Sequence, residues 1–218
     1  MSNLKKIGIL GSGQVARTLG NGFLHLGHAV MLGSRDITKL GDWKEKGGKH
    51  AFSGSFKEVA EFGEIIVLAV SGRAATEAIE SAGPQNLKGK TIIDATNPIS
   101  EQPPMDGVLN FFTSLDESLM EILQERYPAA HFVKAFNSVG NAYMVNPSFK
   151  GGKPSMFICG NNENAKAETT NILDKFGWET VDMGKAASAR AIEPLCMLWC
   201  IPGFLRNEWN HAFKLLMA

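Results

Sequence analysis

Three small residues near the N-terminus are spaced in a way that suits the binding of a pyrophosphate. The segment Gly11-Ser12-Gly13-Gln14-Val15-Ala16 reads G-x-G-x-x-A and follows an apolar run. In this pattern the first glycine permits a tight turn, the second lets a phosphate approach the backbone, and the last small residue lets a helix pack closely on a strand. The free N–H groups at the start of that helix attract phosphate charge. We expect residues 11–16 to bind a dinucleotide.

A second polar group follows the next apolar run, where dinucleotide sites distinguish NAD(H) from NADP(H). An acidic residue there usually binds the ribose hydroxyls of NAD(H), but this chain has Gly33-Ser34-Arg35, with Lys39 a little further on. A guanidinium provides a fork of donors for a 2′-phosphate, Ser34 can donate a further hydrogen bond, and Lys39 adds charge. Asp36 lies beyond the position that reads the ribose. The pattern favours NADP(H).

Polar residues also follow the later apolar runs, and ligands of open α/β sheets lie beyond the carboxyl ends of the strands. Pro98 keeps Asn97 out of the α region, and two further residues offer uncharged hydrogen-bonding groups. Each of these is equally compatible with an ordinary turn or cap. The candidates for the reacting end of the site are Asn97, Asn137 and Ser138. Further candidates for cofactor binding are Ala69, Val70, Ser71, Arg73, Thr96 and Asn97.

The chain has no recognisable constellation for acid–base or nucleophilic catalysis. It contains no G-x-S-x-G elbow and no H-E-x-x-H motif, and its histidines have no partner pattern. Three cysteines without neighbouring His or Asp make a poor metal site, so we expect no metal. This composition fits hydride transfer between two ring cofactors, for which a protein mainly supplies orientation and excludes water.

A parallel sheet is needed to bring these segments together, and the chain alternates short apolar runs with amphipathic stretches of helical length, which is typical of such a sheet. Strands are expected at Lys6–Leu10, Ala29–Gly33, near Ala51–Ser53, and at Glu64–Val70, Thr91–Ala95, His131–Phe136, Met156–Gly160 and Glu179–Met183. Helices are expected at Val15–Leu26 and Asn164–Phe176. The predicted fold class is α/β: a Rossmann-type doubly wound, mostly parallel sheet with a small C-terminal α/β extension.

A Gly-rich turn at residues 149–152 predicts the domain boundary. We expect an NADP-binding Rossmann domain at residues 1–150 and a small C-terminal extension at 151–218 that forms an acceptor pocket, a dimer contact or both. The irregular segment Pro98–Asn110 is of a length that is usually functional or mobile. The apolar segment at 192–204 is compatible with core, a dimer interface or the lining of an acceptor pocket.

The overall composition excludes some classes of partner. Lys plus Arg equals Asp plus Glu at 22 each among 218 residues, so the chain lacks the basic surplus of a nucleic-acid binder. No apolar run approaches the length of a membrane span, and the N-terminus lacks the apolar region of a signal peptide. We expect a cytoplasmic protein with reduced cysteines and no membrane or nucleic-acid partner.

The chain resembles the coenzyme F420-dependent NADP oxidoreductases and the soluble reductase domain of the six-transmembrane ferric reductases. The resemblance extends over nearly the whole length and is most specific at residues 11–16, at Gly33-Ser34-Arg35 with Lys39, and in Asp94-Ala95-Thr96-Asn97-Pro98 and Lys134-Ala135-Phe136-Asn137. It implies a Rossmann core with a small C-terminal extension and, commonly, a homodimer. It also implies hydride transfer between NADP(H) and a flavin or 5-deazaflavin ring.

These observations predict an NADP(H)-dependent oxidoreductase with a flavin-type acceptor, so that F420, FMN or FAD is the co-substrate. One alternative keeps the enzyme class but reduces an imine or a small carbonyl, which requires a proton donor, and Tyr143 is the tyrosine we consider for that role. Another alternative is a redox sensor that binds NADP(H) and turns nothing over.

Overall fold

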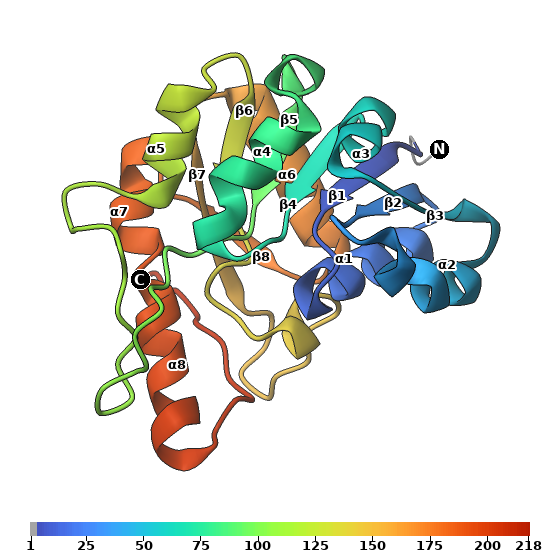
Figure 1. Cartoon of the computed structure of the whole chain (residues 1–218). Coiled ribbons are helices and arrows are strands. Elements are labelled where there is room, and N and C mark those ends of the chain that lie inside the picture. The colour runs from blue at the N-terminus through green and yellow to red at the C-terminus, as the bar shows by residue number, and fades with distance from the viewer. Residues whose placement is uncertain (1–3) are drawn as a thin grey trace.

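A single eight-stranded sheet with helices on both faces forms the centre of the molecule (Figure 1). The structure is a computed structural model that describes residues 4–218. The prediction that the N-terminus lacks a signal peptide falls partly on residues 1–3, which lie outside the described residues. The strands are β1 (Lys6–Leu10), β2 (Ala29–Gly33), β3 (Ala51–Gly54), β4 (Ile65–Leu68), β5 (Thr91–Asp94), β6 (His131–Lys134), β7 (Ser155–Gly160) and β8 (Glu179–Asp182). Their order is β3-β2-β1-β4-β5-β6-β7-β8.

The first six strands are parallel to one another. Strand β7 runs antiparallel to β6, and β8 pairs with β7 in a parallel manner. Starting from β1, the chain adds β2 and β3 on one side of β1 and then crosses back to add β4 on the other side. The strand order therefore reverses between β1 and β4. In a doubly wound sheet, the crevice at this switch point is where ligands bind. The expected Rossmann-type, mostly parallel fold is confirmed, and every expected strand is present with ends that differ by at most two residues.

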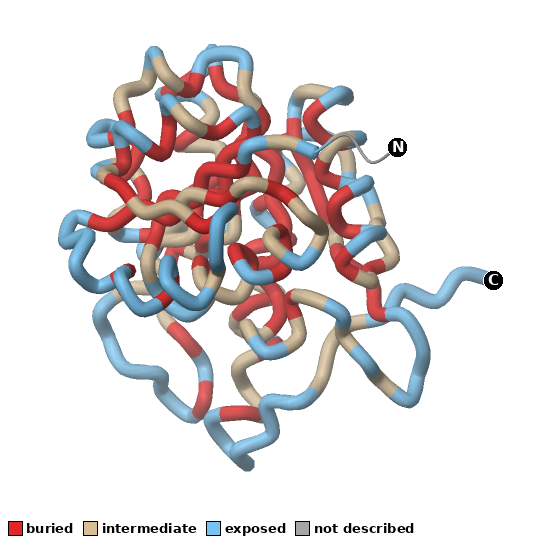
Figure 2. Tube along the Cα trace, turned by 90° about the vertical axis from the view of Figure 1, so that its right-hand side faces the viewer, coloured by how far each residue is buried: buried red, intermediate tan, exposed pale blue. Residues whose placement is uncertain are grey.

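The helices form two layers that bury both faces of the sheet. The α-helices are α1 (Gln14–His25), α2 (Gly41–Gly47), α3 (Phe56–Phe62), α4 (Ala75–Ala82), α5 (Leu119–Arg126), α6 (Glu163–Lys175), α7 (Ala189–Ile192) and α8 (Leu195–Arg206). Helices α1, α2 and α6 cover one core cluster, and α3, α4, α5 and α7 cover the other. Strand β4 shows the period of two, because Ile65 and Val67 join the first cluster and Ile66 and Leu68 the second. Figure 2 shows that the buried residues are concentrated in the interior of the molecule, with exposed residues on its periphery.

Local sequence explains where several helices begin. Ser55 and Glu58 form a capping box at the start of α3, and Ser118 and Glu121 form another at the start of α5. In each box, the serine hydroxyl and the glutamate satisfy backbone N–H groups that the first turn of a helix leaves free. Asn162 caps α6 through its side-chain oxygen.

The C-terminal part continues the sheet and then leaves it. The expected boundary near residue 150 falls between the short helix η5 (Asn141–Tyr143) and β7, and the two-domain division stays a prediction. Helix α8 projects from the body beside the irregular segment that precedes α5 (Figure 1). The last residues return to the body, where the N–H of Ser155 donates to the carbonyl of Phe213. Within residues 4–218, no helix combines the length and apolar character that crossing a bilayer requires.

Candidate functional site

The turn between β1 and α1 is shaped by two glycines with different roles. Gly11 has φ of 147°, and a Cβ there would collide with the carbonyl oxygen of Ala69 on the neighbouring segment. Gly13 has an extended backbone and stands immediately before α1 without a side-chain cap, and a Cβ there would meet nothing within 4 Å. Gly11 therefore permits a close approach within the protein, whereas Gly13 borders open space.

The start of α1 is suited to an anion. Its first turn contains no acidic residue, so its free N–H groups and the helix dipole present an uncompensated positive end. Gln14 and Val15 begin the helix, and Ala16 is fully buried against the turn. Arg17 fixes the arrangement, because its Nε donates to the carbonyl of Ser12 at 3.2 Å and its guanidinium pairs with Asp42.

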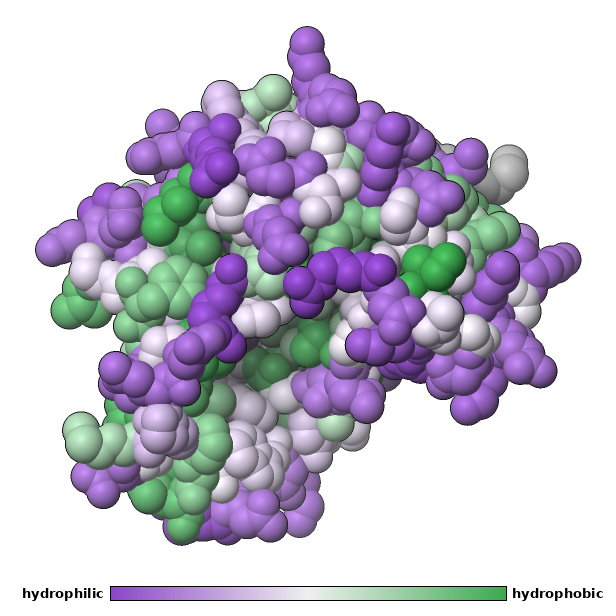
Figure 3. All heavy atoms as spheres, viewed as in Figure 1, coloured by the Kyte–Doolittle hydropathy of each residue, from purple (hydrophilic) through white to green (hydrophobic). Residues whose placement is uncertain are grey.

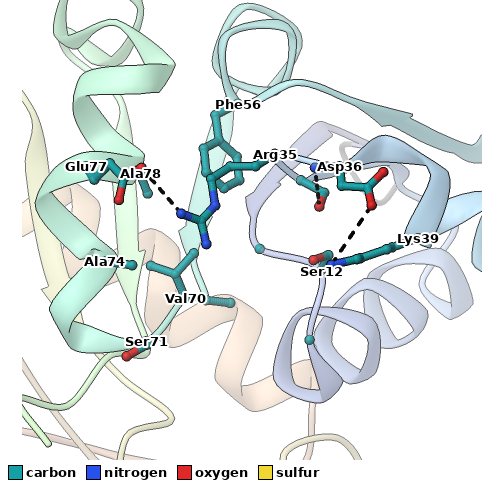
Figure 4. A pocket seen from close by; sticks show the side chains of 14 residues that line it. Ser12, Arg35, Asp36, Lys39, Phe56, Val70, Ser71, Ala74, Glu77 and Ala78 are labelled. Carbon is teal, nitrogen blue, oxygen red and sulfur yellow. Dashed lines mark hydrogen bonds and ion pairs between the residues drawn. The ribbon is translucent and has the colours of Figure 1, made fainter. Parts of the chain in front are cut away.

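A cavity of about 310 Å³ opens beside this turn at the carboxyl ends of β1, β2 and β4 (Figure 4). Ser34, Arg35 and Lys39, the residues expected to bind a 2′-phosphate, all line it. The Ser34 side chain is nearly buried, and its hydroxyl accepts a hydrogen bond from the N–H of Asp36 at 3.1 Å. Arg35 and Lys39 are 74% and 70% exposed. Two exposed cations and a nest of N–H groups can together bind a polyphosphate.

Two carboxylates oppose these cations. Asp36 is held by its own turn, where hydrogen bonds from the side chain and backbone of Thr38 lower the pKa of its carboxyl below the ordinary value. Its Oδ2 lies 4.0 Å from the Nζ of Lys39. Glu77 reaches across from α4, and its Oε1 lies 3.4 Å from Nη1 of Arg35.

Sequence reasoning missed the wall of this cavity that lies opposite β2. Asp36 lines the cavity from the β2 side, and the additional lining residues are Phe56, Ala74, Glu77 and Ala78. Phe56 is the first residue of α3, and the last three belong to the segment leading into α4 or to α4 itself. No motif marks them, because they reach the cavity through the crossover of two helices over the sheet.

A second cavity, of about 320 Å³, continues the groove toward β5. Val70 and Ser71 line both cavities, so the two adjoin. The remaining lining residues of the second cavity are Gly72, Arg73, Ala95, Thr96, Asn97, Ile99 and Ser100. Arg73 forms an ion pair with Glu101 of the irregular segment, so that segment borders this end of the groove. Figure 3 shows apolar surface at the bottom of the hollow between the body and α8.

Asn97 and Asn137 are brought together by reciprocal hydrogen bonds. Nδ2 of Asn97 donates to the carbonyl of Asn137 at 2.8 Å, and Nδ2 of Asn137 donates to Oδ1 of Asn97 at 3.2 Å and to the carbonyl of Ile192 at 2.9 Å. Oδ1 of Asn137 is buried and has no hydrogen-bond partner among the described residues. Ser138 is likewise only 4% exposed. Asn97 borders the second cavity, and Asn137 fixes the orientation of its amide.

The backbone before Asn137 is strained. Phe136 has φ of 64° and is almost fully buried. A bulky residue in this region is uncommon, and such conformations are concentrated at functional sites. The turn at Phe136 directs Asn137 back toward Asn97 and α7.

A buried ionic cluster lies beneath the same edge. Nζ of Lys134 is 2.7 Å from Oδ2 of Asp94 and 2.8 Å from Oε1 of Glu193, and it donates to the carbonyl of Thr96 at 2.9 Å. Burial alone would lower the pKa of Lys134, but the two carboxylates outweigh that effect and raise it. Glu193 also accepts from the N–H groups of Leu119 and Met120. The cluster ties α7 and the start of α5 to the carboxyl end of β5.

Comparisons with known proteins agree with this geometry. A family model described as NADP oxidoreductase, coenzyme F420-dependent, matches residues 6–98. A crystal structure from Arthrobacter sp. FB24, of a candidate F420-dependent NADP-reductase, is 30% identical with a TM-score of 0.91 and covers 99% of this chain and 100% of that one.

Two further matches concern larger proteins. The metalloreductase STEAP3 of Rattus norvegicus is 30% identical over 204 residues, which is 92% of this chain and 39% of that protein. This chain therefore spans about two fifths of that metalloreductase. An imine reductase from Aspergillus terreus, solved with NADPH4, shares the fold with a TM-score of 0.68 at 16% identity and covers 94% of this chain and 64% of that one.

The residues matched by the family model include the phosphate turn, the end of β2 and the start of the loop after β5. The Arthrobacter structure is similar over its entire length. The chain therefore belongs to the coenzyme F420-dependent NADP oxidoreductase family.

Proposed function

We propose that this chain transfers hydride between NADP(H) and a flavin or 5-deazaflavin acceptor, with F420, FMN or FAD as the co-substrate. The observation that carries the proposal is the lining of the second cavity. Its side chains are small, apolar or uncharged polar, and Arg73 is the one charged residue among those that line it. Such a lining can orient a flat ring without a proton donor, which suits hydride transfer between two rings.

The cofactor would lie along the two adjoining cavities. Gly11, Ser12, Gly13, Gln14, Val15 and Ala16 would hold the pyrophosphate, and Ser34, Arg35 and Lys39 the 2′-phosphate. Ala69, Val70, Ser71, Arg73, Thr96 and Asn97 would border its other half. The open space at Gly13 and the free N–H groups of α1 fit a pyrophosphate without rearrangement of the backbone.

When bound, NADPH supplies a hydride, and the residues of the chain position the reactants and exclude water. Asn97 is held in a single orientation by Asn137, and Asn137 is held by the carbonyl of Ile192. A fixed amide beside the cavity can bind a polar group of a ring without the cost of ordering itself. Asn97, Asn137 and Ser138 are therefore our candidates for the reacting end of the site.

The two alternatives from the sequence have less structural support. Reduction of an imine or a carbonyl requires a proton donor near the reacting carbon. Tyr143 lies on η5 with its ring 4.8 Å from that of Phe149, and it is absent from the residues that line the second cavity. A redox sensor requires only the cofactor groove, so it is distinguished from an enzyme by turnover.

The test is steady-state NADPH oxidation with a panel of acceptors: F420, FMN, FAD, a cyclic imine, a small ketone and a ferric chelate. The chelate is included because of the metalloreductase relative. Turnover with a flavin or deazaflavin and not with the imine or ketone supports the proposal. Turnover with the imine alone would assign the first alternative, and tight NADPH binding without turnover of any acceptor would assign the sensor.

We also propose that the protein is a cytoplasmic homodimer in which residues 151–218 provide the dimer contact. The support is that Leu198 and Leu205 on α8, and Met105 and Val108 of the irregular segment, all expose apolar side chains. Gly107 of that segment is adjacent to Leu205. Figure 3 shows apolar side chains on the projecting lower part of the molecule. Light scattering of the purified chain, and of a variant with Leu198→Glu, tests the dimer.

A further inference from the structure

We propose that Glu77 tunes the preference for NADP(H) by competing with the 2′-phosphate for Arg35. This inference rests on the proposed role of Arg35 as a ligand of that phosphate. Arg35 follows β2 and Glu77 lies in the first turn of α4, on opposite walls of the first cavity. Their side chains approach each other across it, with Nη1 of Arg35 3.4 Å from Oε1 of Glu77 (Figure 4).

The formal charges of the side chains that line this cavity cancel. Its lining holds two cations, Arg35 and Lys39, and two carboxylates, Asp36 and Glu77. Asp36 is committed to capping its own turn through Thr38. Within the part of the chain that the structure describes, the side chain of Glu77 has no hydrogen-bond or ion-pair partner other than Arg35. Glu77 is therefore the carboxylate whose main electrostatic effect falls on the cation that a 2′-phosphate needs.

The exposure of the pair decides how it acts. Arg35 is 74% and Glu77 62% exposed, and pairs of this kind contribute little to stability because water screens them. A phosphate with two charges and three acceptor oxygens binds a guanidinium more strongly than a single carboxylate does. The Arg35–Glu77 pair can therefore open without unfolding anything, and NADP(H) must displace Glu77 whereas NAD(H), which lacks the phosphate, need not.

The rival explanation is a local role in α4. A carboxylate in the first turn of a helix interacts favourably with the helix dipole, and Glu77 occupies such a position. That role predicts a small change in thermal stability for Glu77→Gln and no change in cofactor affinity, so cofactor titration separates the two explanations.

The experiment titrates NADPH and NADH by fluorescence into the wild type, Glu77→Gln, Arg35→Ala and the double variant, at low and high salt. For Glu77→Gln at low salt we expect the dissociation constant of NADPH to fall roughly three- to tenfold and that of NADH to change less than about twofold. The gain should shrink at high salt and disappear in the Arg35→Ala background. Glu125→Gln, an exposed position on α5, is the matched control and should leave both affinities unchanged.

Each contrary result has a distinct meaning. If Arg35→Ala abolishes the preference for NADPH but Glu77→Gln leaves NADPH affinity unaltered, the inference about Glu77 fails alone. An equal gain for NADPH and NADH, or a gain that persists without Arg35, also overturns it. If Arg35→Ala leaves the NADPH preference of the wild type intact, the proposed phosphate site itself is wrong and the inference falls with it.

Discussion

Lys134 and Asp94 face each other from the carboxyl ends of neighbouring strands, with Nζ 2.7 Å from Oδ2 and both side chains fully buried. Glu193, the residue that directly follows α7, is the third member of the cluster. One lysine and two carboxylates leave a formal surplus of negative charge, which the N–H groups of Leu119 and Met120 help to stabilise. The pair therefore anchors the C-terminal part of the chain beneath the edge where Thr96 and Asn97 emerge.

The first prediction follows from this burial. Lys134→Met should lower the free energy of unfolding by about 3–5 kcal/mol, because it leaves two buried carboxylates without their counter-charge. Urea denaturation measures the change. Adding Asp94→Asn should recover part of the loss. Lys153→Met, which removes an exposed pair with Asp174, is the control and should have little effect; an equally small loss for Lys134→Met would contradict the ionic role of the cluster.

Arg35→Ala tests the choice of cofactor. We expect the wild type to bind NADPH at least about tenfold more tightly than NADH, since a hydrogen bond to a charged group contributes about 1.5–3 kcal/mol. The variant should lose most of that preference and keep its affinity for NADH. Isothermal titration calorimetry gives both constants. Arg206→Ala, at an exposed pair with Glu208, is the control, and equal binding of the two cofactors by the wild type would refute the prediction.

Gly13→Val tests the phosphate turn. The backbone at Gly13 is extended and a Cβ there meets nothing within 4 Å, so the fold should survive with an unchanged melting temperature. Its branched side chain would occupy the space that a pyrophosphate needs, and NADPH binding should fall by at least about a hundredfold, comparable to the loss of several charge-assisted hydrogen bonds. Gly151→Val, in an open surface turn, is the control. Normal NADPH affinity in folded Gly13→Val would show that the phosphate lies elsewhere.

The pH dependence of stability should include a contribution from Glu121. The guanidinium of Arg190, with the Ser118 hydroxyl and N–H, lowers the pKa of its carboxyl below the ordinary value of 4.5. A lowered pKa means that the stabilisation is present above pH 4.5 and is lost as the pH falls through the folded-state value. Glu121→Gln should therefore cost up to about 1 kcal/mol near neutral pH, because glutamine can still complete the capping box but no longer carries the charge that pairs with Arg190, and the cost should be less in acid. Thermal melts of the wild type and the variant from neutral to acidic pH measure this cost, with Glu125→Gln as the control. A cost that does not change with pH would contradict the prediction.

The sequence predicted the parts of the fold and site that depend on local patterns. The order β1–turn–α1–β2 and the positions of Ser34, Arg35 and Lys39 follow from a single β-α-β unit, in which the turn and both strand ends are close in the chain. The carboxyl-edge rule also indicated Thr96 and Asn97, and both line the second cavity; their part in cofactor binding stays a prediction.

What the sequence could not predict depends on contacts between distant segments. Glu193 meets residues 73 and 74 positions away, and neither its neighbours nor its spacing indicate a buried partner for Lys134. Glu77 reaches the cavity because α4 crosses over the sheet, and a glutamate in the first turn of a helix is ordinary on its own. Asn137 was recognised as polar, but its bond to the carbonyl of Ile192 depends on where α7 docks.

The last prediction concerns that amide. Asn137→Leu removes the donor that fixes Oδ1 of Asn97 and leaves the carbonyl of Ile192 without it. We expect turnover with a flavin or deazaflavin acceptor to fall at least about tenfold, because a misplaced positioning group costs alignment at the reacting centre. NADPH affinity should change little, since the phosphate contacts lie at the other end of the groove.

Three measurements are needed to interpret this variant: kcat and KM for the acceptor, the NADPH dissociation constant and the melting temperature. An unpaired buried group costs about 1–3 kcal/mol, so some loss of stability is expected, and the kinetics are to be measured well below the melting temperature of the variant. Asn164→Leu, at an exposed position of α6, is the matched control. If Asn137→Leu keeps full kcat with every flavin acceptor, the Asn97–Asn137 pair does not position the reactants. The reacting end of the groove must then be sought among Ser71, Arg73 and Thr96, which line the second cavity together with Asn97.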